Sequence, residues 1–171
     1  YQSKGLVVGY VQSGKTANYT AVAARAVDAG YRLVIVLSGI HDSLRNQTQN
    51  RLERELTGHQ ADNHPVAGCS TEWNMLTTPS EDFRGQDEHI LQFPGNFLAV
   101  VKKNVAVLQK LDRWLESASS YLDDMAVLII DDEADQASIN TKGNRPLDPA
   151  IGDGDEDDEN LAPSRTNALI R

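Results

Sequence analysis

The chain of 171 residues has the length of one ordinary domain, which is long enough to bury a core. With 40% hydrophobic and 24% charged residues, its composition is that of a globular, water-soluble protein. The lone Cys69 excludes a disulfide framework within the chain and favours a reducing, cytoplasmic setting. The residues given contain no signal-peptide pattern, and no apolar run approaches the ~20 residues of a membrane helix, so we expect neither feature in this part of the protein.

The net charge of −9 is concentrated in one segment, so it neither supports nor excludes a nucleic-acid partner. Six acidic residues lie within 153–159, and without them 19 acids face 16 bases. Such a run is usually solvated, so we expect a disordered acidic loop over 140–163. Because Tyr1 lies only a few residues before the first expected strand, we expect residues 1–171 to be a single domain cut from a longer protein.

Apolar runs alternate with amphipathic stretches along the chain, a pattern that predicts strands alternating with helices. Gly30 predicts the end of the first helix, and Asp42 caps the second. Alternation of this kind gives a parallel sheet with right-handed crossovers. We expect strands at 5–8, 33–37, 97–101 and 126–130, and helices at 17–28, 42–56 and 104–117.

Two stretches have no long periodic pattern. Within 59–96 we expect a short strand near Val66 and a short helix after Ser80, since a structureless loop of that length is improbable in a compact domain. Beyond the acidic loop, a helix is expected from Ser164 through Leu169.

Residues Gly9 to Thr16 read Gly-Tyr-Val-Gln-Ser-Gly-Lys-Thr and match the phosphate-binding pattern G-x-x-x-x-G-K-[ST] completely. The match lies between an expected strand and an expected helix. In that position the backbone amides of the loop and the N-terminus of the helix are both expected to point at the phosphates of a bound nucleotide. Lys15 is predicted to reach the β- and γ-phosphates of ATP, and the Thr16 hydroxyl to bind Mg²⁺. The cofactor-binding residues expected here are Gly9, Gln12, Ser13, Gly14, Lys15 and Thr16.

A second motif follows the last apolar strand, where Asp131-Asp132-Glu133-Ala134-Asp135 begins. A carboxylate at the end of such a strand can order the Mg²⁺ shell, and the next one can polarise the attacking water. We assign Asp132 to the metal and Glu133 to the water. Asp131 remains the rival for the metal, because one step along a strand reverses the side chain.

A glutamate beside the metal carboxylate favours ATP hydrolysis over phosphoryl transfer to a metabolite. The alternatives left open are a P-loop kinase, a GTP-hydrolysing switch and a non-catalytic nucleotide-binding module. The switch is disfavoured because the chain contains no guanine-reading Asn-Lys-x-Asp string. The expected fold is a three-layer α/β P-loop NTPase (RecA-like) domain with a mainly parallel central sheet.

The string Asp132-Glu133-Ala134-Asp135 downstream of a phosphate loop resembles the first motor domain of superfamily-two helicases. Further strings, taken together, resemble the Z-one domain family, which is described as a family of endonucleases. This resemblance implies a helicase-like ATPase that acts on DNA in restriction-type defence, with a second RecA-like lobe beyond Arg171. The strings that carry it are 9–19, 38–49, 101–104, 131–141 and 167–171.

Candidate nucleic-acid contacts follow two of the strands. Arg45, Gln47, Gln49 and Arg51 open the second helix, where Arg and Gln are suitable donors to a phosphate backbone. Their spacing spreads them around the helix, so some must be structural. Lys102 and Lys103 follow the third strand at a similar edge. We select Arg45, Gln47 and Lys102.

The remaining chemistry-bearing residues have ordinary interpretations. The four histidines form no ligand cluster with one another or with Cys69, so no metal besides Mg²⁺ is expected. Trp73 and Trp114 are expected to be core or half-buried anchors instead of base-stacking platforms. No nuclease constellation of carboxylates and a lysine is recognisable, so the sequence itself does not support an endonuclease activity.

Overall fold

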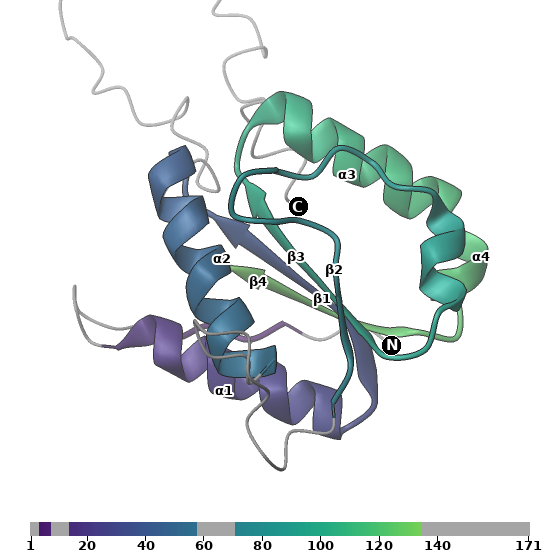
Figure 1. Cartoon of the computed structure of the whole chain (residues 1–171), viewed down its shortest axis with the longest axis horizontal. Helices are drawn as coiled ribbons and strands as arrows, with labels where there is room; N and C mark the ends of the chain where they lie inside the picture. Colours follow the sequence, from purple (N-terminus) through teal and green to yellow (C-terminus); the bar gives the residue numbers. More distant parts are fainter. Residues whose placement is uncertain (1–3, 8–13, 58–70, 135–171) are drawn as a thin grey trace, which may run out of the picture.

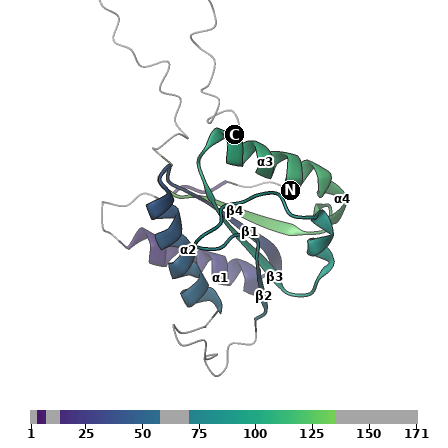
Figure 2. The same ribbon diagram turned by 45° about the horizontal axis from the view of Figure 1, so that its top comes forward.

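The computed structural model describes residues 4–7, 14–57 and 71–134, and folds them into an α/β structure with a four-stranded, all-parallel sheet (Figures 1 and 2). The strand order is β2-β3-β1-β4, so β2 and β3 are neighbours in the sheet, whereas β1 and β2, and β3 and β4, are not. The elements in chain order are α1 (Lys15–Asp28), β1 (Tyr31–Ser38), α2 (Asp42–Thr57), β2 (Trp73–Met75), the 3-10 helix η1 (Glu88–Gln92), β3 (Asn96–Lys102), α3 (Val105–Ser117), α4 (Ser119–Leu122) and β4 (Ala126–Asp131).

The two central strands, β1 and β3, are buried on both faces, as their unbroken apolar sequences predicted. Alternate side chains divide the core between two helical layers, with α1 and α2 on one face of the sheet and α3 on the other (Figure 1). The face towards α1 and α2 contains Val34, Val36, Leu98 and Val100, and the face towards α3 contains Leu33, Ile35, Leu37, Phe97, Ala99 and Val101.

The helix boundaries follow their local signals. Gly30 adopts φ 98° directly after α1, and its amide donates to the carbonyl of Val27 at 2.9 Å, which closes the helix. Asn104 precedes α3, and its side-chain oxygen accepts from the amide of Ala106 at 3.0 Å. The predicted helices at 17–28, 42–56 and 104–117 and the predicted strands at 33–37, 97–101 and 126–130 are confirmed to within a few residues.

The predicted buried strand at 5–8 is wrong for the part of it that the structure describes. Residues 4–7 form no strand, and Leu6 and Val7 are 84% and 69% exposed. An apolar run becomes a strand only when a neighbouring strand accepts its hydrogen bonds, and the run itself cannot show whether one does. Val8 lies outside the described residues.

The described part of the stretch between α2 and β3 contains one short strand and, after Ser80 as predicted, one short helical turn that begins only at Glu88. Its short strand is β2, which pairs Trp73 with Asn96 of β3, and its helical turn is η1. The expected strand near Val66, the acidic loop at 140–163 and the helix at 164–169 lie outside the described residues. In the part of the chain that the structure describes, no helix is both long and apolar enough to cross a bilayer.

Candidate functional site

The topology brings the first residues of α1 to the same edge of the sheet as the acidic motif. The turn at Ala29-Gly30 reverses the chain, so α1 runs antiparallel to β1. With 14 residues in α1 and 8 in β1, the two elements span about 21 Å and about 26 Å. Gly14 and Lys15 therefore lie at the carboxyl edge of the sheet, where the strands β1 and β4 also end (Figure 1).

The acidic motif forms a tight turn at the end of β4. The amide of Asp132 donates to the carbonyl of Leu37 at 2.9 Å, and the amide of Glu133 donates to Asp132 Oδ1 at 3.0 Å. Glu133 has φ 53°, the left-handed region that costs a non-glycine residue about 1–2 kcal/mol. Outliers of this kind persist where surrounding contacts hold them, and they are frequent at functional sites.

The alternation of β4 places its two candidate carboxylates on opposite faces. Leu128 and Ile130 pack towards α1 and α2, whereas Val127 packs towards α3. Asp131 has the parity of Val127, and Asp132 continues the parity of Ile130. The Asp132 side is thus the side of the helix that follows the glycine loop.

Asp131 has a partner on its own face. Lys103 Nζ lies 2.5 Å from Asp131 Oδ1 and donates to the carbonyl of Glu133 at 2.8 Å. The Lys103 side chain is 0% exposed, so this lysine, unlike the edge position considered from the sequence, is part of the protein interior. The amide of Lys103 also donates to the carbonyl of Gly39 at 3.3 Å. One buried residue after β3 therefore contacts the ends of β1 and β4.

A pocket of about 200 Å³ opens beside the acidic turn. Its floor comes from the end of β1, one wall from α2 and the other from the turn after β4. The lining residues are Ser38, Gly39, Leu44, Gln47, Thr48, Arg51, Asp132 and Glu133.

The polar residues that open α2 divide into two pairs with helical spacing. Arg45 and Gln49 point inward and are 2% and 0% exposed, whereas Gln47 and Arg51 line the pocket. The prediction that some of these four residues are structural is confirmed. Thr48, which also lines the pocket, was missed because a lone threonine within a polar helix gives no distinguishing signal.

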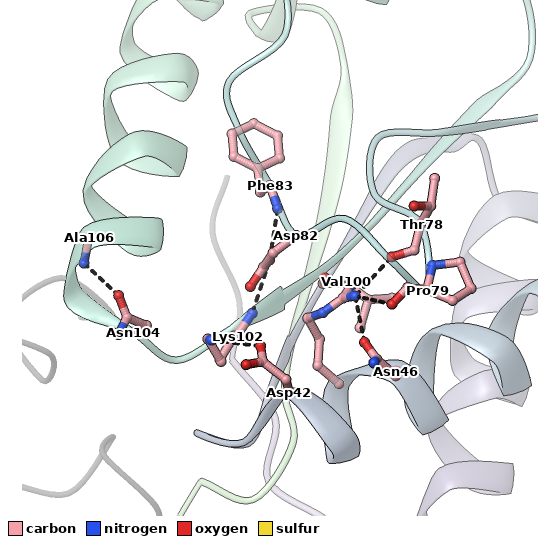
Figure 3. Close-up of polar contacts among 11 residues, drawn as sticks. Asp42, Asn46, Thr78, Pro79, Asp82, Phe83, Val100, Lys102, Asn104 and Ala106 are labelled. Carbon is pink, nitrogen blue, oxygen red and sulfur yellow. Dashed lines mark hydrogen bonds and ion pairs between the residues drawn. The ribbon is translucent and has the colours of Figure 1, made fainter.

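Arg45 is a structural residue in this fold, which corrects its selection as a nucleic-acid contact. Its guanidinium donates to the carbonyls of Val100, Thr78 and Pro79 at 3.3, 2.8 and 2.8 Å. It also donates to Asn46 Oδ1 at 2.7 Å, and Figure 3 shows these contacts converging between α2, β3 and the loop after β2. Because the Arg45 guanidinium is buried and donates to these four groups, it is not positioned to bind a phosphate at the surface.

Gln47 is exposed, whereas the Lys102 side chain is only 19% exposed. Lys102 Nζ donates to Asp42 Oδ1 at 2.6 Å in an ion pair at the protein surface, drawn in Figure 3. This hydrogen bond holds the pKa of Asp42 below its usual value. The amide of Lys102 also donates to Asp82 Oδ1 at 3.4 Å, which joins the loop after β2 to the end of β3.

Only part of the phosphate loop falls within the described residues. Gly14 adopts φ 75° immediately before α1, and its carbonyl accepts from the amide of Asn18 at 3.2 Å. That left-handed conformation suits glycine, as the motif predicts. The predicted roles of Gly9, Gln12 and Ser13 lie outside the described residues, as do the side chains of Lys15 and Thr16.

The aromatic anchors are placed as predicted. Trp114 is 4% exposed and meets Phe83 edge-on with a centroid separation of 5.4 Å, while Trp73 is half-buried against the α1 and α2 side of the core. His89 lies against Asp87, with Nδ1 2.6 Å from Oδ1, and adjoins Glu88. This exposed group lies at the start of η1, where Asp87 also accepts from the His89 amide and so caps the turn.

Searches of protein-family models, of curated proteins and of solved structures find no match to this chain. The fold and the site define the chain as an α/β protein with a candidate site at the carboxyl edge of a parallel sheet.

Proposed function

We propose that this chain is the ATP-binding and ATP-hydrolysing domain of a helicase-like, DNA-directed motor. One observation carries the proposal. The parallel sheet brings the start of the helix after Gly9–Thr16 and the turn Asp131–Glu133 to the same edge. Ligands of open α/β sheets bind outside the carboxyl ends of the strands, which is the edge that holds the start of α1 and the acidic turn.

The proposed fold is a P-loop NTPase domain of the RecA-like type. The four-stranded parallel sheet with helices on both faces supports it. Among the described residues β4 pairs with β1 alone. Residues 4–7 form no strand, so the strand predicted at 5–8 is not part of this proposal.

Each residue of the two motifs has a proposed role. Backbone amides of Gly9 to Thr16 hold the phosphates of ATP, and Lys15 contacts the β- and γ-phosphates. Glu133 accepts a proton from a water molecule. The water oxygen then bonds to the γ-phosphorus while the bond between the γ-phosphorus and the β–γ bridging oxygen breaks. ADP leaves and keeps the bridging oxygen.

Asp132 and Thr16 would hold the Mg²⁺ that accompanies ATP. Carboxylate and hydroxyl oxygens suit this ion, and Asp132 lines the pocket beside α2 at the carboxyl edge of the sheet. When bound, Mg²⁺ neutralises charge on the phosphates. The rival carboxylate, Asp131, is engaged by buried Lys103 on the opposite face, which favours Asp132 for the metal.

The DNA-directed part of the proposal rests on the helicase-like strings and on polar side chains near the same edge. Gln47 is exposed beside the acidic turn, and Lys102 ends β3 near the start of α2. Both suit contacts to a phosphate backbone. The partner and the second lobe expected from the resemblance belong to this proposal, whereas Arg45 does not.

Nucleotide binding by the full-length protein tests the first step of this function. We expect a fluorescent ATP analogue to bind in the presence of Mg²⁺ and Lys15→Ala to abolish binding, whereas Lys110→Ala, on the exposed side of α3, leaves it unchanged. Unlabelled ATP should compete better than GTP. Equal competition by GTP would favour the switch, and binding unaffected by Lys15→Ala would contradict the proposed phosphate loop.

A further inference from the structure

The Lys103 side chain is fully buried although it carries a charge, and such burial is costly unless partners compensate for it. Replacing buried ion pairs with apolar residues is often neutral or stabilising, so stability alone does not account for a lysine here. Its two contacts in the acidic turn are more informative. Both the Asp131 carboxylate and the Glu133 carbonyl belong to the segment that presents Asp132 and Glu133.

Lys103 contacts Glu133 at the residue with a left-handed backbone conformation. Glu133 has φ 53°, and its carbonyl is the group that Lys103 Nζ holds at 2.8 Å. The Glu133 amide is held from the other side by Asp132 Oδ1 at 3.0 Å. Lys103 is itself fixed to β1 through the carbonyl of Gly39. The left-handed residue is therefore clamped between its own turn and the neighbouring strand end.

We infer that Lys103 is a positioning residue that sets the orientation of Asp132 and Glu133 by holding the left-handed turn closed. This inference rests on the proposed function for its catalytic consequence. Lys103 lies on the α3 face, away from the face on which Asp132 continues β4, and acts through the backbone. Partners that orient catalytic or metal-binding groups typically contribute about 10-fold to 100-fold to activity or metal affinity.

The test compares Lys103→Met, Lys103→Arg and Lys110→Met in the full-length protein. Lys103→Met removes the charge, Lys103→Arg keeps a buried donor, and Lys110 is an exposed lysine on α3. We expect Lys103→Met to lower kcat about 10-fold to 100-fold with nucleotide affinity retained. Lys103→Arg should restore part of the loss, and Lys110→Met should behave as the unmodified protein.

Amide hydrogen exchange, read residue by residue by NMR, gives a second readout that needs no ATP turnover. In Lys103→Met, exchange at Asp132 and Glu133 should accelerate about tenfold while β1 and β3 keep their protection. Uniform acceleration across the sheet, or no change at the turn, would overturn the inference. If Lys103→Met does not fold, Asp131→Asn should give the same local pattern. An unmodified protein without ATPase activity would defeat the proposed function, whereas the exchange result would still decide the role of Lys103.

Discussion

The amide of Asp132 donates to the carbonyl of Leu37 at 2.9 Å and so extends the pairing of β4 with β1 past its last register pair, Leu37 with Asp131. Leu37 is 5% exposed and belongs to the central strand. The acidic turn is thus attached to a buried central strand, which is the support that a site requiring fixed carboxylates needs.

Arg45 should matter for stability. Arg45→Met would remove this donor from the buried carbonyl of Val100 and from the part-buried carbonyls of Thr78 and Pro79, so we expect a loss of about 3 kcal/mol in the free energy of unfolding. Arg54→Met is the control, because the Arg54 side chain is 66% exposed. Urea unfolding measures both. An equal effect of the two substitutions would show that Arg45 has no structural role.

Phe83 should be a main anchor of the loop between β2 and β3. It is 1% exposed and packs edge-on against Trp114, so Phe83→Ala should cost about 3–4 kcal/mol. Phe93 belongs to the same loop but is 61% exposed, and Phe93→Ala should change stability by less than about 0.5 kcal/mol. Thermal unfolding of the two variants compares them directly. Similar melting temperatures would contradict the packing described here.

Gly95 should tolerate alanine less well than Gly85. Both adopt positive φ, 95° and 82°, but an added Cβ at Gly95 would approach the Glu72 carbonyl oxygen to 2.9 Å, whereas at Gly85 it meets nothing within 4 Å. We expect Gly85→Ala to cost about 1 kcal/mol and Gly95→Ala about 2 kcal/mol or more. Equal urea midpoints for the two variants would show that the added Cβ at Gly95 meets no steric clash, which would contradict this prediction.

The ion pair of Asp42 with Lys102 predicts a pH-dependent contribution to stability. The hydrogen bond from Lys102 lowers the pKa of Asp42 from 3.8, so the stabilisation is complete above that value and disappears as the pH falls through the lowered pKa. The stability difference between the unmodified protein and Asp42→Asn should therefore be constant near neutral pH and vanish in acid. Asp123→Asn, at the exposed end of α4, controls for general charge effects. A stability difference between the unmodified protein and Asp42→Asn that grew as the pH fell would contradict the predicted direction of the pH dependence.

The sequence was most informative where local pattern and tertiary environment agree. Leu33 to Leu37 and Phe97 to Val101 are unbroken apolar runs, and each became a strand buried on both faces. Gly30 and Asn104 ended and began helices at the predicted places because caps depend on a few adjacent residues. The approach of the acidic motif to the start of α1 follows from the alternation of strands and helices.

Features that depend on distant partners were not predictable. Nothing near Lys103 in the sequence shows that its charge would be buried against Asp131, 28 residues later. Arg45 and Gln47 look equivalent in sequence, yet helical geometry turns one inward and the other towards the pocket. Residues 4–7 have the composition of a buried strand but lack a strand's pairing in this structure.

We propose that Glu133 serves ATP hydrolysis at the carboxyl edge of the sheet. The most direct measurement is steady-state ATP turnover by the full-length protein carrying Glu133→Gln, with nucleotide affinity measured in parallel and Glu116→Gln on the exposed side of α3 as the control. We predict that Glu133→Gln lowers kcat at least about 100-fold while ATP still binds, and that Glu116→Gln has no effect. Unchanged turnover in Glu133→Gln would contradict the claim.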